Sequence, residues 1–151
     1  MAAIIDNKLV GPYRVPDGIK INSESYCNFL QGNFFNKWFN RKPKAFKKSV
    51  VFMQDNAPSH ASKYTKSWLA KKGIEEDCLM TWPPASPDIN PIENLWSMLK
   101  RTVYTEGHQY TSLNSLWEAV LAAAGKVTPT EIKKLTSSVD KRLLQVIEKK
   151  G

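Results

Sequence analysis

The sequence predicts an α/β domain that ends in a helical tail, and three observations support this. Two short apolar runs, Ser49–Met53 and Cys78–Trp82, have the composition of strands buried on both faces. Segments in which apolar residues recur at helical spacing alternate with these runs. Only helical patterns follow residue 105. We therefore expect a single domain over residues 1–151, with a helical tail at 105–151.

The amino-terminal residues predict a β-hairpin or meander. Ile4–Ile5 and Leu9–Val10 are β-prone, and the intervening Asp6-Asn7 is a turn former. A helix is then expected from about Ser23, with Ser23 as its N-cap.

Helix boundaries further along the chain are set by caps, prolines and glycines. Gly73 is expected to stop the helix that begins at Pro58 or Ser59. Asn90-Pro91 supplies a cap followed by proline at the first helical position. Thr128 and Glu131 form a capping-box pattern. The predicted helices, in chain order, run over residues 23–39, 58–72, 91–103, 112–124, 129–136 and 139–149.

Composition narrows the class of protein. The 151 residues carry 22 Lys and Arg against 14 Asp and Glu, a net charge of +8, which favours a polyanionic partner such as nucleic acid. No apolar run approaches the roughly 20 residues of a membrane helix, so no membrane association is expected. The first residues lack the basic region of a secretory signal. Cys27 and Cys78 fit neither a zinc pattern nor a disulfide framework, and two thiols in a reducing compartment are expected.

Two acidic residues lie at the ends of predicted elements, one after a strand and one at the start of a helix. Asp55 follows the first buried run, at the carboxyl end of a strand, where ligands collect in open α/β sheets. Glu93 lies in the first turn of a helix that follows the second run. Convergent carboxylates of this kind can hold divalent ions for phosphoryl transfer. Equally, Asp55 can be a turn former and Glu93 half of a capping interaction.

The surroundings of both acids resemble those in a known family. Residues 51–60 (VFMQDNAPSH) look like the signature around the second aspartate of mariner-type DDE/D transposases. Residues 82–96 (WPPASPDINPIENLW) resemble the block that holds the last acid of the same family. The two motifs occur in the family's order, and the resemblance extends less strictly over residues 4–103.

This resemblance implies a ribonuclease H-like mixed sheet flanked by helices, a Mg²⁺ or Mn²⁺ cofactor, and cleavage and joining of transposon-end DNA. It assigns Asp55 and Glu93 as catalytic, metal-binding acids. The family's first aspartate has no match, since Asp6 and Asp17 both lie in turn contexts. We therefore expect the first, central strand to be missing and the acidic triad to be incomplete. A second copy of the chain or a partner would then complete the sheet.

Two further features remain open to two interpretations each. A basic segment over residues 37–48 could follow a DNA backbone or be a solvated loop. Its cations are Lys37, Arg41, Lys42, Lys44, Lys47 and Lys48. His60 could lie near the metals or pack in the first turn of its helix.

The function predicted on these grounds is a nuclear transposase-derived domain that acts on DNA. The isolated chain is expected to be inactive because one acid is unmatched. The alternative is a domesticated, non-catalytic module that binds DNA or protein.

Overall fold

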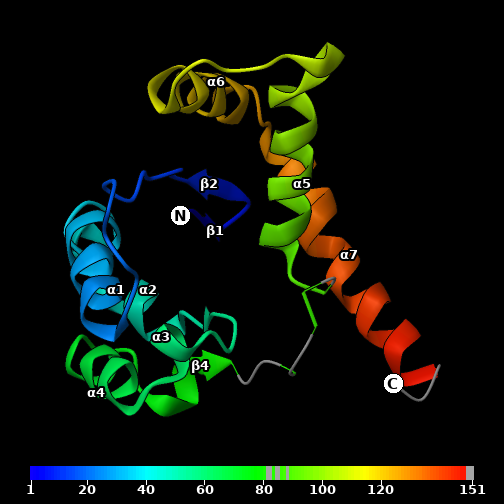
Figure 1. Cartoon of the computed structure of the whole chain (residues 1–151). Coiled ribbons are helices and arrows are strands. Elements are labelled where there is room, and N and C mark those ends of the chain that lie inside the picture. Colours follow the sequence, from blue (N-terminus) through cyan, green and yellow to red (C-terminus); the bar gives the residue numbers. More distant parts are fainter. Residues whose placement is uncertain (81–82, 84–85, 88, 149–151) are drawn as a thin grey trace. The chain divides into compact units, whose positions relative to one another are not determined.

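The computed structural model describes residues 1–80, 83, 86–87 and 89–148. The chain divides into two compact units. The central unit is Pro16–Ala85, and the terminal unit combines Met1–Val15 with Ser86–Gly151. Figure 1 shows the elements of both units along the chain. The single-domain assignment for residues 1–151 stays a prediction.

The strands form two separate two-stranded sheets within the described residues. In the terminal unit, β1 (Ala3–Ile5) pairs antiparallel with β2 (Lys8–Val10). Asp6 and Asn7 join them at φ values of 50° and 57°, the positive values of a two-residue type I′ turn, so the predicted hairpin is confirmed. In the central unit, β3 (Phe52–Met53) pairs parallel with β4 (Leu79–Met80).

The first helix of the central unit, α1 (Ser23–Leu30), is capped one residue earlier than predicted. Asn22, not Ser23, is the N-cap, because its side chain accepts from the Ser25 amide while the Ser25 hydroxyl accepts from the Asn22 amide. The helix continues through a π-helical turn, η1 (Gln31–Phe35), followed by a 3₁₀ turn, η2 (Phe39–Arg41).

The strand predicted at 49–53 is shorter than expected. Pro43 precedes a further helix, α2 (Lys44–Ser49), which takes up the start of the predicted strand. Val51 is 64% exposed, so this run is not buried on both faces. The second predicted strand is likewise reduced to Leu79–Met80, and Thr81 and Trp82 lie outside the described residues.

The helix predicted at 58–72 is interrupted once. α3 (Pro58–Ala61) ends at Ser62, whose side chain accepts from the Thr65 amide and so caps α4 (Lys63–Lys71). Gly73 at φ 85° stops α4 as predicted, and η3 (Glu76–Cys78) leads into β4. α1 packs on both α3 and α4. Among the described residues of this unit, the largest fully buried side chains are Cys27, Phe35, Phe39, Thr65, Leu69 and Ile74.

The terminal unit carries the predicted helical tail. α5 (Pro91–Val103) and the short η4 (Thr105–Gly107) precede α6 (Leu113–Gly125) and α7 (Pro129–Glu148). α5 packs against α6 and α7, and Figure 1 shows α7 crossing α5. The core of the unit is formed by Leu95, Leu99, Val103, Ala123 and Ala124.

The two helices predicted at 129–136 and 139–149 form one continuous helix. No glycine or proline lies between Thr136 and Val139 to end the first, and Ser138 is accommodated by bonding back to the Leu135 carbonyl at 2.7 Å. Lys149 lies outside the described residues.

Both cysteines are free, as expected, with Cys27 buried and Cys78 half-buried. None of the helices in the described part of the chain is long and apolar enough to cross a membrane.

Candidate functional site

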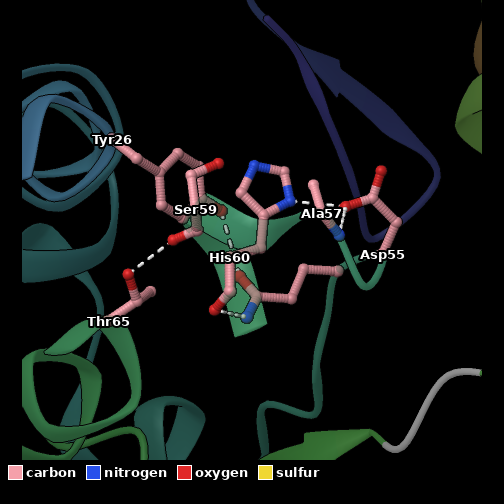
Figure 2. Close-up of polar contacts among 7 residues, drawn as sticks. Tyr26, Asp55, Ala57, Ser59, His60 and Thr65 are labelled. Carbon is pink, nitrogen blue, oxygen red and sulfur yellow. Dashed lines mark hydrogen bonds and ion pairs between the residues drawn. The ribbon is translucent and has the colours of Figure 1, made fainter. Parts of the chain in front are cut away.

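Asp55 lies two residues beyond the end of β3, with its side chain 50% exposed. Its Oδ1 accepts a hydrogen bond from the Ala57 amide at 3.0 Å, so the residue does act as a turn former. The same oxygen lies 2.5 Å from Nδ1 of His60. Among the described residues no hydrogen bond goes to Oδ2, and Figure 2 shows this second oxygen pointing away from both partners.

His60 is fixed on two sides. Its ring lies against the ring of Tyr26, with centroids 4.1 Å apart, as Figure 2 shows. Its carbonyl accepts from Nε2 of Gln54 at 3.0 Å, and Oε1 of Gln54 accepts from the Tyr26 hydroxyl at 3.0 Å. The imidazole is therefore held between the turn that carries Asp55 and helix α1.

Burial, the charge of Asp55 and the nearby Cys27 raise the pKa of Tyr26 well above its usual range. The phenol therefore stays protonated over any ordinary pH. This suits its role as a hydrogen-bond donor to Gln54.

A second polar contact ties α3 to the core of the central unit. The Thr65 hydroxyl, fully buried, donates to the Ser59 carbonyl at 2.6 Å. It lies 3.7 Å from Sγ of Cys27 on α1. The short helix α3, which carries His60, is thus anchored through Ser59, the residue immediately before His60.

Glu93 occupies the first turn of α5, as predicted, and its side chain is exposed. The cap is made by Asn90, whose Oδ1 accepts from the Ile92 amide at 3.1 Å. The Asn90 carbonyl also accepts from Nδ2 of Asn94 at 3.1 Å. Because Asn90 caps the helix by itself, the Glu93 carboxylate is not needed for capping, and the positive end of the helix dipole favours its charge.

The two predicted metal-binding acids belong to different units. Asp55 is part of the central unit and Glu93 of the terminal unit. Their use as one site stays a prediction. Within the described ranges, no three His, Cys, Asp or Glu side chains come together as a metal-binding group.

The basic segment, residues 37–48, is not an open loop. It contains η2 and all but the last residue of α2, and it lies on the aromatic core of the central unit. Trp38, for example, is stacked on Phe34 at 5.5 Å and meets Phe46 edge-on at 5.7 Å.

The six predicted DNA-binding cations differ in their surroundings. Lys42 lies over the Trp38 ring at 4.6 Å, and Lys47 lies over the Phe39 ring at 5.6 Å. Lys37 donates to Oδ1 of Asn33 at 2.9 Å. The side chains of Lys37, Arg41, Lys44 and Lys48 are exposed, whereas those of Lys42 and Lys47 are half-buried.

Sequence reasoning missed Tyr26 and Gln54 as parts of the Asp55 surroundings. Tyr26 belongs to the apolar face of the helix predicted from Ser23, and that pattern indicates only burial. Gln54 precedes Asp55 directly, and this adjacency was the one signal available in the sequence.

The comparisons with known proteins identify the family. The model of the DDE superfamily endonuclease family matches residues 24–116, a stretch that includes both Asp55 and Glu93. The chain belongs to this family. Together with this match, the similarity to curated transposases and to a solved transposase structure confirms the resemblance to mariner-type DDE/D transposases.

Curated relatives of this DDE-family chain are transposases. It is 36% identical over 132 residues to the transposable element Tc3 transposase of Caenorhabditis elegans. The aligned region covers 87% of this chain and 38% of that protein. It is 34% identical over 104 residues to the transposable element Tcb1 transposase of Caenorhabditis briggsae, covering 69% and 36%. The chain thus spans less than two fifths of the length of these relatives.

The fold of the DDE-family chain is also similar to a solved structure. The crystal structure of the catalytic domain of Mos1 mariner transposase matches with a TM-score of 0.74 and 18% identity, over 90% of this chain and 65% of that one. This confirms the predicted ribonuclease H-like α/β fold, with small sheets flanked by helices.

Proposed function

We propose that this chain supplies two metal-binding acids and a DNA-contacting surface to a transposase catalytic centre that cleaves and joins DNA. The observation that carries the proposal is that both acids lie in the stretch that matches the family and have exposed carboxylates. Asp55 and Glu93 each present an exposed carboxylate on a locally fixed backbone. Neither carboxylate is fully used in holding its own turn or helix.

The donor chemistry fits Mg²⁺ or Mn²⁺, because both ions favour carboxylate oxygens. Oδ2 of Asp55 and the Glu93 carboxylate would hold the ions. When bound, a pair of such ions stabilises the attacking and leaving oxygens of an in-line phosphoryl displacement. The residues of this chain contribute ligand orientation and charge.

The acidic triad is proposed to be incomplete within residues 1–151. Asp6 lies at the tip of the β1–β2 turn, and Asp17 is exposed beside Gly18, which has φ 77°. Asp6 follows β1 directly but lies in the turn of an antiparallel hairpin, whereas Asp55 follows a strand of a parallel pair. Asp17 lies seven residues beyond the end of β2. A third carboxylate from another segment or chain would complete the ligand set. A second copy or a partner that adds a strand is therefore proposed.

Calorimetry with Mn²⁺ tests the metal site. The chain should bind Mn²⁺, and both Asp55→Asn and Glu93→Gln should abolish or strongly weaken that binding. Asp77→Asn and Glu118→Gln, exposed acids in the central and the terminal unit, should leave it unchanged. Absence of binding in the unmodified chain, or equal effects of the four substitutions, would contradict the proposal.

DNA binding is proposed for Lys37, Arg41, Lys42, Lys44, Lys47 and Lys48. Their support is the net charge of +8 and the ordered aromatic base under the basic segment. Contacts of this kind go to phosphates and weaken steeply with salt. Action on chromosomal DNA would place the protein in the nucleus.

A non-catalytic, domesticated DNA-binding module is the second candidate, and the ordered basic segment favours it independently of the acids. Measuring DNA affinity with and without Mn²⁺ distinguishes the two candidate functions. A non-catalytic binder should retain full affinity without a divalent ion and in the Asp55→Asn and Glu93→Gln variants. A catalytic centre should gain DNA affinity from Mn²⁺ only when both acids are present.

A further inference from the structure

The Asp55 carboxylate is held by a chain of contacts that begins in the core of the central unit. Tyr26, buried on α1, donates to Gln54, and Gln54 donates to the His60 carbonyl. The Tyr26 ring also lies against the His60 imidazole at 4.1 Å. Nδ1 of His60 then meets Oδ1 of Asp55. Figure 2 shows His60 between Tyr26 and Asp55.

The orientation of this carboxylate matters because only one of its oxygens is left for an ion. With the Ala57 amide as the sole donor, a half-exposed Asp side chain could rotate about its terminal bond and exchange its two oxygens. A second donor at Oδ1, itself fixed by packing, opposes this rotation. Hydrogen-bond partners of metal-binding carboxylates commonly have this effect.

The geometry points to His60 as a positioning residue that donates from Nδ1 to Asp55 and keeps Oδ2 directed outward for a divalent ion. This inference rests on the proposed function of Asp55 as a metal ligand. The competing explanation is that His60 only packs against Tyr26 and fills space. The two roles require different parts of the imidazole, a nitrogen donor in one case and an aromatic face in the other.

Two substitutions at this position separate the roles. His60→Asn keeps a side-chain N–H close to the Nδ1 position but loses the ring, whereas His60→Phe keeps a ring against Tyr26 but loses the donor. If His60 positions Asp55, His60→Phe should weaken Mn²⁺ affinity about tenfold and His60→Asn should largely retain it. The melting temperature should show the reverse order, with His60→Phe more stable than His60→Asn, because the ring contact with Tyr26 contributes to packing. A Mn²⁺ affinity that follows the ring and not the donor would overturn the inference.

A measurement without metal checks the hydrogen bond itself. The chain has two histidines, and the exposed His108 of the terminal unit serves as an internal reference. In ¹⁵N-histidine spectra, with His60→Asn used for assignment, His60 should carry a proton on Nδ1. Asp55→Ala should shift the His60 nitrogens and leave those of His108 unchanged. An unprotonated Nδ1 in the unmodified chain, or no response to Asp55→Ala, would overturn the inference.

The outcomes distinguish this inference from the proposed function. Mn²⁺ binding that needs Asp55 but tolerates His60→Phe overturns the role of His60 and still supports the proposed metal site. No Mn²⁺ binding in the unmodified chain overturns both. Binding that needs Asp55 and a donor at position 60, together with a protonated Nδ1, supports both.

Discussion

The Lys42 ammonium lies 4.6 Å from the centre of the Trp38 ring and 5.7 Å from that of Phe46. A cation in this position is attracted by the ring faces, and its aliphatic stem covers apolar surface. Lys44, two residues on, is exposed at the start of α2. The basic segment therefore contains cations that stabilise the fold and cations that project into solvent.

Substitution should separate these two classes. Lys42→Ala should lower the free energy of unfolding by about 0.5–1 kcal/mol, because it removes the contact with Trp38. Lys44→Ala should change it by less than about 0.5 kcal/mol, as expected of an exposed residue. Urea denaturation followed by circular dichroism measures both.

DNA affinity should depend on the exposed Lys44. In fluorescence-anisotropy titrations over a salt series, Lys44→Ala should weaken binding and reduce the slope of log affinity against log salt by about 1. A Lys44→Ala variant with unchanged affinity and slope would remove this residue from the DNA-contacting surface.

Asn90 links the stability of α5 to the placement of Glu93. Asn90→Ala removes the acceptor of the Ile92 amide at the buried start of the helix, and should cost about 1 kcal/mol of unfolding free energy. It should also weaken Mn²⁺ binding, because the turn that frays carries Glu93. Ser112→Ala removes the equivalent cap of α6 and should cost a similar free energy of unfolding. It should leave the affinity for Mn²⁺ unchanged. Equal effects of the two variants on Mn²⁺ would contradict this link.

The parts of the fold that were predictable are those with local causes. The Asp6-Asn7 turn, the Asn90 cap and the Gly73 stop each depend on one or two residues whose side chain or backbone freedom decides the geometry. The strand at 49–53 was overestimated for the same reason. Its apolar composition favours a strand, but Pro43 begins a helix that extends to Ser49.

The site was predictable only in part. Asp55 and Glu93 lie in motifs that can be read along the chain, whereas the contact between Tyr26 and His60 joins α1 to α3 and depends on how these helices pack. No periodicity or spacing indicates such a contact. The division of the basic segment into ring-bound and projecting lysines likewise depends on where the rings of Trp38, Phe39 and Phe46 lie.

Thr65 is a buried polar residue on which the anchoring of α3 depends. Thr65→Val keeps the shape of the side chain but leaves the Ser59 carbonyl without its donor, and should cost about 1–3 kcal/mol of unfolding free energy. Thr102→Val, at an exposed position of α5, should change it by less than about 0.5 kcal/mol. Urea denaturation of the two variants measures the difference, and similar losses in both would contradict a special role for Thr65.

The start of α7 should be sensitive to acid. The Thr128 amide, the Thr128 hydroxyl and the charge of Lys134 lower the pKa of Glu131 below its ordinary value of about 4.3. Because the folded chain holds this carboxylate in its charged form, the capping box stabilises the fold fully above the ordinary pKa. That stabilisation is lost as the pH falls through the lowered pKa of the folded state.

Urea denaturation from pH 7 to pH 2 should therefore show a constant difference in unfolding free energy between the unmodified chain and Glu131→Gln at neutral pH. The difference should shrink below about pH 4, where the carboxyl groups become protonated. Thr130→Ala, in the same turn, should keep the pH dependence of the unmodified chain. A difference between the unmodified chain and Glu131→Gln that stays constant down to pH 2 would show that the charge of Glu131 does not stabilise the start of α7.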